Sequence, residues 1–191
     1  LLMSLPLSSE NSILKVENLA SRPYVEMTLS TLEKFGIEIE SLQKNSLDIF
    51  TIKGNKNYKS ISYQVENDWS SASFWIVAAA LGQDISLAGL NFKSFQADIV
   101  IIDALKNANC EIIIDGENLL SINGENRKSF KFDATDCPDL FPALAVFALF
   151  CKGSSEIKGL SRLIHKESNR GLVLQEEFSK LGAKISLEGD L

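Results

Sequence analysis

One turn occurs three times in this sequence at a fixed spacing. Three short segments each end an amphipathic helical pattern and begin an alternating one, and their central residues are Gly36, Asn109 and Gly182, at a constant interval of 73 residues. Glycine and asparagine are the residues that most readily adopt the left-handed conformation in which many helices end. Each segment is therefore predicted to be a helix-to-strand turn. The period predicts a chain built from repeated units.

A second set of repeated segments supports a similar period. Leu19, Leu90 and Leu160 end similar short segments at intervals of 71 and 70 residues, so the unit is about 70 residues long. Hydrophobic periodicity in the second copy predicts the order helix, strand, helix and hairpin. The predicted ranges are a buried helix over 70–81, a strand over 85–87, an amphipathic helix over 95–106, and a hairpin of 111–114 with 119–122.

The other two copies follow the same order and predict an α/β (α+β) fold. The third copy has an apolar helix over 139–151, a strand over 156–157 and an amphipathic helix over 167–181. The first copy begins part-way through its apolar helix, so we expect the chain to be part of something larger. The polar stretch 54–60 is typical of a loop, and a domain boundary is expected near residue 66.

Composition excludes several classes of protein. A net charge of -6 and a pI near 4.9 argue against a nucleic-acid-binding surface. Three cysteines and one histidine cannot complete a Cys/His zinc site, and no run reaches the roughly 18 apolar residues that cross a bilayer. We therefore expect a soluble, cytoplasmic protein with reduced thiols, with no metal, nucleic acid or membrane as partner.

The chemistry is expected at a charged cluster and at one distant acid. Lys166, Glu167 and Arg170 lie where a helix is predicted to begin, and free backbone amides with two cations there suit an anion. Asp139 follows Pro138 at the start of the apolar helix, whose burial is expected to place this acid in a cleft, where it could take a proton. The simpler alternatives are a solvated Glu167–Arg170 pair and a capping aspartate.

Other polar residues carry weaker signals. Ser21 and Tyr24 offer two hydroxyls toward one ligand at a helix start, while Ser70-Ser71 is predicted to cap the buried helix. His165 precedes the charged cluster and is most simply structural. Cys137 lacks a local base, so we interpret it as a small buried residue.

Together these residues resemble a known family. Four motifs, at 21–29 (SRPYVEMTL), 65–73 (VENDWSSAS), 137–139 (CPD) and 166–170 (KESNR), are similar in order and spacing to those of the 3-phosphoshikimate 1-carboxyvinyltransferases, the EPSP synthases. The resemblance implies the enolpyruvyl transferase fold, six βαβαββ units in two domains of three. It implies that this chain holds about two and a half to three units: 1–65 would end the first domain, and 66–191 would form two units of the second.

The resemblance also implies a reaction. The family transfers the enolpyruvyl group of phosphoenolpyruvate to the 5-hydroxyl of shikimate 3-phosphate, in the shikimate pathway of aromatic amino-acid biosynthesis, without metal or cofactor. By motif position, Asp139 and Glu167 would be catalytic. Shikimate 3-phosphate would be held by Ser21, Tyr24, Asp139 and Lys166, and Arg170 would bind phosphoenolpyruvate. Glyphosate is the family's inhibitor.

Some features depart from the family pattern. Asn169 and Asn67 replace the usual aspartate and glycine, and Arg162 occupies a position that contacts substrate in some members. The family's other phosphate-binding motifs lie outside this sequence, which implies an inactive central fragment of an active, monomeric parent. Two alternatives stay open: an enzyme like UDP-N-acetylglucosamine enolpyruvyl transferase, although its reactive cysteine loop has no match here, or a non-catalytic fragment that self-associates.

Overall fold

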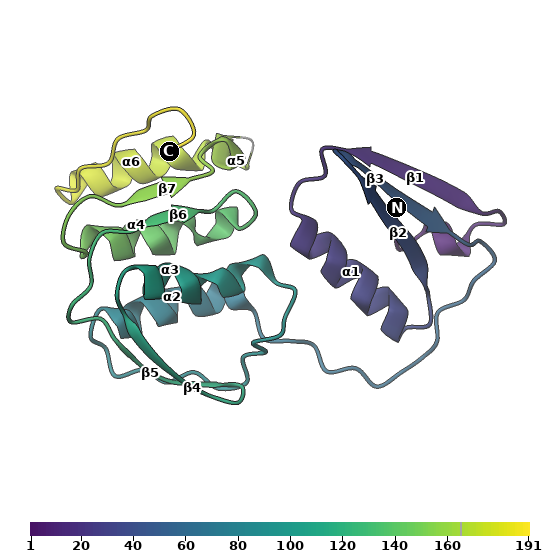
Figure 1. The fold of residues 1–191 in the computed structure, drawn as a ribbon, viewed down its shortest axis with the longest axis horizontal. Coiled ribbons are helices and arrows are strands. Elements are labelled where there is room, and N and C mark those ends of the chain that lie inside the picture. The colour runs from purple at the N-terminus through teal and green to yellow at the C-terminus, as the bar shows by residue number, and fades with distance from the viewer. Residues whose placement is uncertain (165) are drawn as a thin grey trace. The chain divides into compact units, whose positions relative to one another are not determined.

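The computed structural model describes residues 1–164 and 166–191. They form two compact units, Leu1–Val65 and Glu66–Leu191, and each is described by itself. Both units combine helices with small sheets (Figure 1). The predicted mixed α/β class is therefore confirmed.

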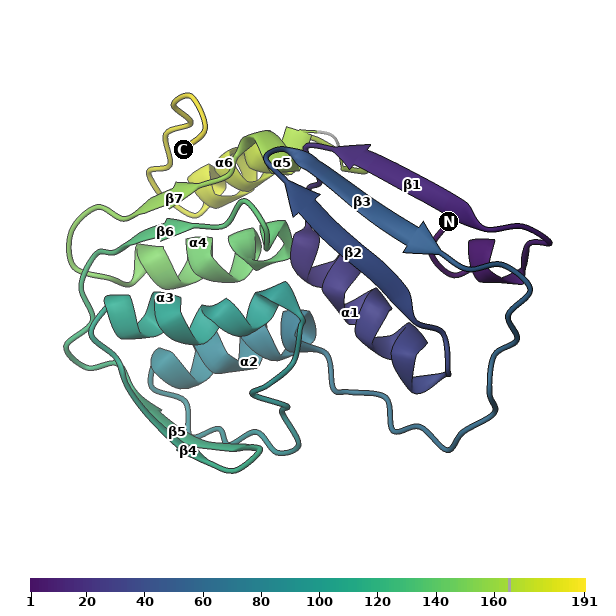
Figure 2. The same ribbon diagram turned by 45° about the vertical axis from the view of Figure 1, so that its right-hand side comes forward.

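The unit Leu1–Val65 is a three-stranded sheet with one long helix. Its antiparallel strands have the order β1 (Ser12–Glu17), β3 (Leu47–Ile52) and β2 (Ile39–Lys44), and α1 (Arg22–Lys34) lies along the sheet (Figure 2). A short 3-10 helix, Leu5–Leu7, precedes them. Alternate side chains of β3 are buried, as expected of a central strand with one covered face.

The unit Glu66–Leu191 begins with the second copy of the repeat. It contains α2 (Trp69–Ala80), a 3-10 turn (Ala97–Val100) that continues into α3 (Ile101–Asn107), and the hairpin β4 (Glu111–Asp115) with β5 (Asn118–Asn123). The prediction of a strand over 85–87 is wrong. Only Leu87 pairs with a strand residue, Leu119, in an isolated bridge, and the next contact with the hairpin is the Leu90 amide, which donates to the carbonyl of Glu117 at 2.8 Å.

The third copy of the repeat completes this unit. Strand β6 (Lys131–Asp133) pairs in parallel with β7 (Glu156–Lys158), and a 3-10 turn (Pro138–Leu140) leads into α4 (Phe141–Leu149). Two more helices follow, α5 (Ser161–Ile164) and α6 (Arg170–Lys180). The largest fully buried apolar side chains of the unit come from both copies: Trp69, Ile76, Ile101, Leu105, Leu119, Leu140, Leu144, Phe147 and Leu163.

The three repeated turns have the same backbone geometry. The φ angles of Gly36, Asn109 and Gly182 are +82°, +69° and +84°. The amide of the residue after each one donates to the carbonyl five residues earlier: Ile37 to Leu32 at 2.9 Å, Cys110 to Leu105 at 3.0 Å, and Ala183 to Phe178 at 3.0 Å. This is the Schellman motif, and it confirms the left-handed helix ends predicted from the period.

The continuation after these turns differs between copies. Strands β2 and β4 follow the first two turns, whereas 183–191 contains no strand, so that part of the prediction is wrong. The backbone there makes single contacts instead of a ladder: Gln175 Nε2 donates to the carbonyl of Ile185 at 2.8 Å, and the Gly159 amide donates to the carbonyl of Asp190 at 2.8 Å. A strand needs a partner ladder, and periodicity alone does not supply one.

Two predicted helix starts shift for the same reason. Helix α2 is capped by Asp68, whose Oδ1 accepts from the amide of Ser70 at 2.9 Å, instead of by the serine pair. Helix α6 begins at Arg170 instead of residue 167, because the Asn169 side chain accepts from the amide of Leu172 at 3.3 Å. Short Asp and Asn side chains satisfy the free amides of a first turn well.

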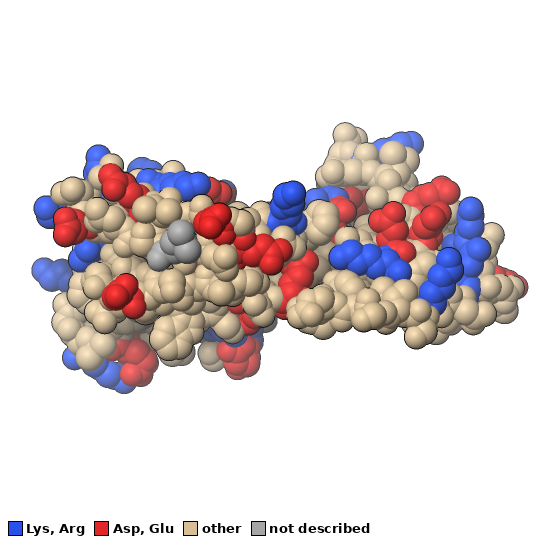
Figure 3. Space-filling model, turned by 90° about the horizontal axis from the view of Figure 1, so that it is seen from below, with Lys and Arg blue, Asp and Glu red and all other residues tan. Residues whose placement is uncertain are grey.

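The surface carries side chains of both charges, as the composition leads us to expect. On the face in Figure 3, acidic and basic side chains are interspersed over both units. No helix in the part of the chain that the structure describes is long and apolar enough to cross a membrane.

Candidate active site

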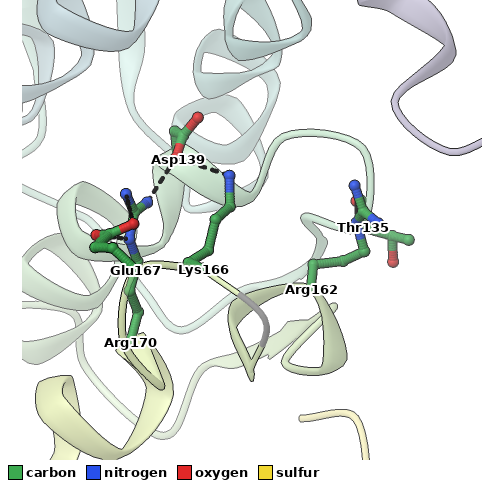
Figure 4. A network of polar contacts seen from close by, with 6 residues as sticks. All are labelled: Thr135, Asp139, Arg162, Lys166, Glu167 and Arg170. Carbon is green, nitrogen blue, oxygen red and sulfur yellow. Dashed lines mark hydrogen bonds and ion pairs between the residues drawn. The ribbon is translucent and has the colours of Figure 1, made fainter.

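Four charged residues of the unit Glu66–Leu191 form one network. Asp139, Lys166, Glu167 and Arg170 point toward one another across the starts of two helical segments (Figure 4). Asp139 lies in the 3-10 turn that precedes α4. The apolar face of α4 is anchored in the core by Phe141, Leu144 and Phe147, so this acid is carried on a rigid element.

Asp139 contacts both cations of the cluster. Arg170 Nη1 donates to Asp139 Oδ1 at 2.6 Å, and Lys166 Nζ lies 3.6 Å from the same oxygen. Arg170 also holds Glu167 with two hydrogen bonds, from Nε to Oε1 at 2.8 Å and from Nη2 to Oε2 at 3.1 Å. The guanidinium therefore bridges the two carboxylates with a two-pronged contact to one of them.

The start of α6 fixes the position of this guanidinium. Asn169 caps the helix, and Gly171 is buried against Leu160. A Cβ at residue 171 would lie 2.4 Å from Leu160 Cδ1, so the backbone next to Arg170 packs closely on the loop after β7. A glycine in a first helical turn is explained by such a close approach.

The site is open to solvent. The Asp139 side chain is 38% exposed and that of Glu167 is 68% exposed, while both cations are half-buried. The expectation of a desolvated acid in a cleft is wrong for Asp139, because its side chain faces solvent although its neighbours Pro138 and Leu140 are buried. Two cations face two carboxylates, so an anionic ligand must compete with Asp139 and Glu167 for Arg170.

The pKa values of the cluster reflect this pairing. The hydrogen bonds from Arg170 lower the pKa of Glu167, and the contacts with Glu167 and then Asp139 raise the pKa of Arg170. At neutral pH, Glu167 is therefore a carboxylate, able to accept a proton but not to donate one. A donor role requires a change in its surroundings.

The loop before Asp139 is held by a residue that the sequence left unassigned. Arg162 Nε of α5 donates to the carbonyl of Thr135 at 3.1 Å (Figure 4). The Thr135 amide donates in turn to Asp133 Oδ1 at 3.0 Å, and Lys158 Nζ donates to Asp133 Oδ2 at 2.9 Å. These contacts tie both strands of the parallel pair to the segment that leads to Asp139. A contact to a backbone carbonyl has no sequence signal.

Ser21 and Tyr24 lie in the other unit, at the start of α1. Ser21 precedes the helix with φ +54° and ψ +42°, and its side chain does not cap the helix. The amide of Tyr24 donates to the carbonyl of Ser21 at 3.1 Å, so the two residues share one tight turn. The sequence placed both at a helix start, and the structure does so too. His165 lies outside the described residues.

Cys137 and possible metal ligands complete the inventory of reactive groups. Burial, followed by the charges of nearby aspartates, raises the pKa of Cys137 to about 12, so its thiol is protonated near neutral pH. This agrees with the interpretation of Cys137 as a buried structural residue. Within residues 1–164 and 166–191, no three His, Cys, Asp or Glu side chains gather as metal ligands would.

Comparisons with known proteins show which fold and which family this chain has. The chain has the fold of an EPSP synthase from Acinetobacter baumannii, with a TM-score of 0.73 and 22% identity, over 99% of this chain and 43% of that one. It is thus a protein of the enolpyruvyl transferase fold class. The sequence matches the family model of EPSP synthase (3-phosphoshikimate 1-carboxyvinyltransferase) over residues 1–191, and the chain belongs to this family.

Curated relatives agree with that assignment. A 3-phosphoshikimate 1-carboxyvinyltransferase of Clostridium acetobutylicum is 40% identical over 186 residues, 97% of this chain and 42% of the relative. One from Brachyspira hyodysenteriae is 38% identical over 192 residues, covering all of this chain and 45% of the relative. The relatives are named as enzymes, and this chain spans less than half of their length.

Proposed function

We propose that this chain takes part in the transfer of the enolpyruvyl group of phosphoenolpyruvate to the 5-hydroxyl of shikimate 3-phosphate, with release of phosphate. The observation that supports it most is the contact of Asp139 with Lys166 and Arg170, because it sets a solvent-accessible base between two anion-binding groups. Membership in the EPSP synthase family supports the choice of substrates.

The two cations have separate tasks in this proposal. Lys166, with the hydroxyls of Ser21 and Tyr24, holds shikimate 3-phosphate, and Arg170 holds phosphoenolpyruvate. The planar guanidinium suits a carboxylate or a phosphate, which it contacts through two donors at once. The ligand takes over donors that contact Glu167 and Asp139 in the free protein.

The two acids move protons. Asp139 accepts the proton of the 5-hydroxyl while that oxygen bonds to C2 of phosphoenolpyruvate, and Glu167 gives a proton to the methylene carbon. The tetrahedral intermediate then loses phosphate, which takes up the proton held by Asp139, and one methyl proton returns to Glu167, which restores the double bond in the product. Each transfer needs an acid or base within hydrogen-bond reach of the reacting atom.

Ligand binding prepares Glu167 for its donor role. In the free protein, its hydrogen bonds with Arg170 keep its pKa low. When phosphoenolpyruvate occupies Arg170, Glu167 loses that partner and gains an anionic neighbour, and both changes raise its pKa. The protonated form that donates to carbon is therefore produced by substrate binding.

We further propose that the 191 residues bind ligand but do not complete the reaction alone. They span 42% to 45% of the length of the relatives quoted above, so the reaction depends on residues beyond these. A coupled assay of phosphate release checks this: the isolated chain should give no turnover above background. Turnover at the rate of a full-length family member would refute the proposal.

An NMR titration tests the substrate class. Shikimate 3-phosphate should shift the amide resonances around Lys166 and Arg170 of the ¹⁵N-labelled chain, and UDP-N-acetylglucosamine should leave them unchanged. A response to the nucleotide sugar alone would favour the other enolpyruvyl transferase. Silence toward both ligands, with sedimentation that depends on protein concentration, would favour a self-associating, non-catalytic role.

A further inference from the structure

Asp48 is a buried carboxylate that the proposed reaction does not use. It alternates with exposed or half-buried residues on β3 and shares the core face of that strand with Phe50 and Ile52. Asp48 is only 4% exposed. A carboxylate at such a position is costly unless it is ionised beside a cation or hydrogen-bonded.

The cation beside it is the first residue of α1. Arg22 Nη2 donates to Asp48 Oδ1 at 2.5 Å, and Arg22 Nη1 lies 3.7 Å from Glu26 Oε1 on the next turn. The Arg22 side chain is 34% exposed, so the pair lies at the edge of the core with its acid inside. A cation in the first turn of a helix lies at the positive end of the helix dipole, where it is unfavourable. The two carboxylates offset this repulsion.

The strand that carries Asp48 is the most constrained part of its unit. Strand β3 is the central strand, and Asp48 is in register with Val16 on one side and with Gln43 on the other. The carboxylate is therefore attached to a backbone that hydrogen-bonded neighbours hold from both sides. It provides a fixed point to which the start of α1 is tied.

The residue before Arg22 needs such a tie. Ser21 adopts φ +54° and ψ +42°, a left-handed conformation that is uncommon for any residue other than glycine. Strained backbone of this kind persists only where the surroundings determine it. The Arg22–Asp48 pair supplies one such constraint next to Ser21 and two residues before Tyr24.

We propose that Asp48, acting through Arg22, is a positioning residue that presents the Ser21 and Tyr24 hydroxyls to shikimate 3-phosphate. This inference rests on the proposed function, since it names the residue that shapes the same binding turn. Without Asp48, the Arg22 guanidinium loses its buried anchor and the turn relaxes toward ordinary φ values. The two hydroxyls then no longer converge on one ligand.

Three variants of the 191-residue chain test the proposal. Asp48→Ala removes the anchor, Asp48→Asn keeps an acceptor of the same shape without the charge, and Glu26→Ala removes the exposed partner of Arg22 as a matched control. In Asp48→Ala the dissociation constant for shikimate 3-phosphate should rise about tenfold, with Asp48→Asn in between and Glu26→Ala within about twofold of the unmodified chain. Equal affinities for the unmodified chain and Asp48→Ala would overturn the proposal.

A ligand-free measurement separates this inference from the proposed function. The Arg22 Nε–Hε resonance and the backbone shifts of Ser21 and Tyr24 should change in Asp48→Ala and recover in part in Asp48→Asn, while resonances of residues 66–191 stay in place. If the unmodified chain does not bind shikimate 3-phosphate, the proposed function fails, and these resonances still decide the role of Asp48. Unchanged Ser21 and Arg22 signals would overturn it. If Asp48→Ala does not fold, the same comparisons are made with Asp48→Asn.

Discussion

Arg170 Nη1 donates a 2.6 Å hydrogen bond to Asp139 Oδ1 and thereby joins two helical starts that lie 31 residues apart in the sequence. The same guanidinium binds both oxygens of Glu167. One cation therefore connects the two acids to which the proposal gives opposite proton transfers. With Lys166, which lies 3.6 Å from Asp139 Oδ1, the four side chains carry no net charge in the ligand-free protein, and a substrate anion can replace a carboxylate at Arg170.

Removal of Asp139 should affect stability only weakly. Because its ion pairs are partly exposed, we expect Asp139→Ala to change the free energy of unfolding by about 0–1 kcal/mol. Urea denaturation measures this, with Asp84→Ala, a change at an exposed acid outside the cluster, as control. A loss of several kcal/mol for Asp139→Ala alone would mean that the network supports the fold instead of a ligand site.

Glu167 should titrate at a higher pH once Arg170 is removed. The hydrogen bonds from Arg170 hold the pKa of Glu167 below its ordinary value, so Arg170→Met should return that pKa toward the unfolded one. A carboxyl with a lowered folded pKa stabilises the protein above its unfolded pKa, and this contribution is lost as the pH falls through the folded pKa. The Glu167 side-chain carbonyl resonance, followed against pH, gives the pKa of Glu167 in the unmodified chain and in Arg170→Met. An unchanged midpoint in Arg170→Met, or an equal shift in the control Lys180→Met, would contradict the assignment.

The Cys137 thiol should resist alkylation. Its pKa of about 12 leaves roughly one thiol in ten thousand ionised at pH 8. Iodoacetamide and mass spectrometry should therefore detect little modification of Cys137 in the native chain and full modification in urea. Rapid labelling of the native protein at this residue would reopen a cysteine-dependent mechanism.

Asn109 tests the repeated helix ends. Its φ of +69° suits asparagine and glycine, so Asn109→Ala should lower the free energy of unfolding by about 1 kcal/mol, whereas Asn109→Gly should cost less or stabilise. Thermal unfolding of both variants measures the difference. Equal effects of alanine and glycine would show that the loss of the Asn109 side chain's bond to the carbonyl of Asn126 matters more than the backbone.

Local features of the fold were predictable from the sequence, and tertiary ones were not. The constant spacing of Gly36, Asn109 and Gly182 predicted three left-handed helix ends. One glycine or asparagine is enough to set that conformation locally. The strand expected over 85–87 is reduced to the single bridge of Leu87 with Leu119, since a strand exists only where a partner backbone meets several consecutive residues. The expected strand after Gly182 failed for the same reason.

In the candidate site, too, local contacts were predictable from the sequence and tertiary contacts were not. The sequence predicted the contact of Glu167 with Arg170 as a pair three residues apart on one helix, and the contact forms although α6 begins only at Arg170. The contact of Asp139 with Lys166 and Arg170 depends on how the starts of two helical segments of the third copy, 31 residues apart, come together, which no local pattern records. Asp48 could have been noticed as a charge on the buried face of an alternating strand, but its partner Arg22 lies 26 residues away.

The most direct test is the affinity of the chain for shikimate 3-phosphate, measured by calorimetry for Lys166→Met and for Lys180→Met. Lys166 lies at the proposed site, whereas Lys180 pairs with Glu176 and Glu177 at the other end of α6, so the second variant removes the same charge away from the ligand. The account predicts a dissociation constant at least about tenfold higher for Lys166→Met and nearly unchanged for Lys180→Met. Equal affinities in both variants and the unmodified chain would contradict it.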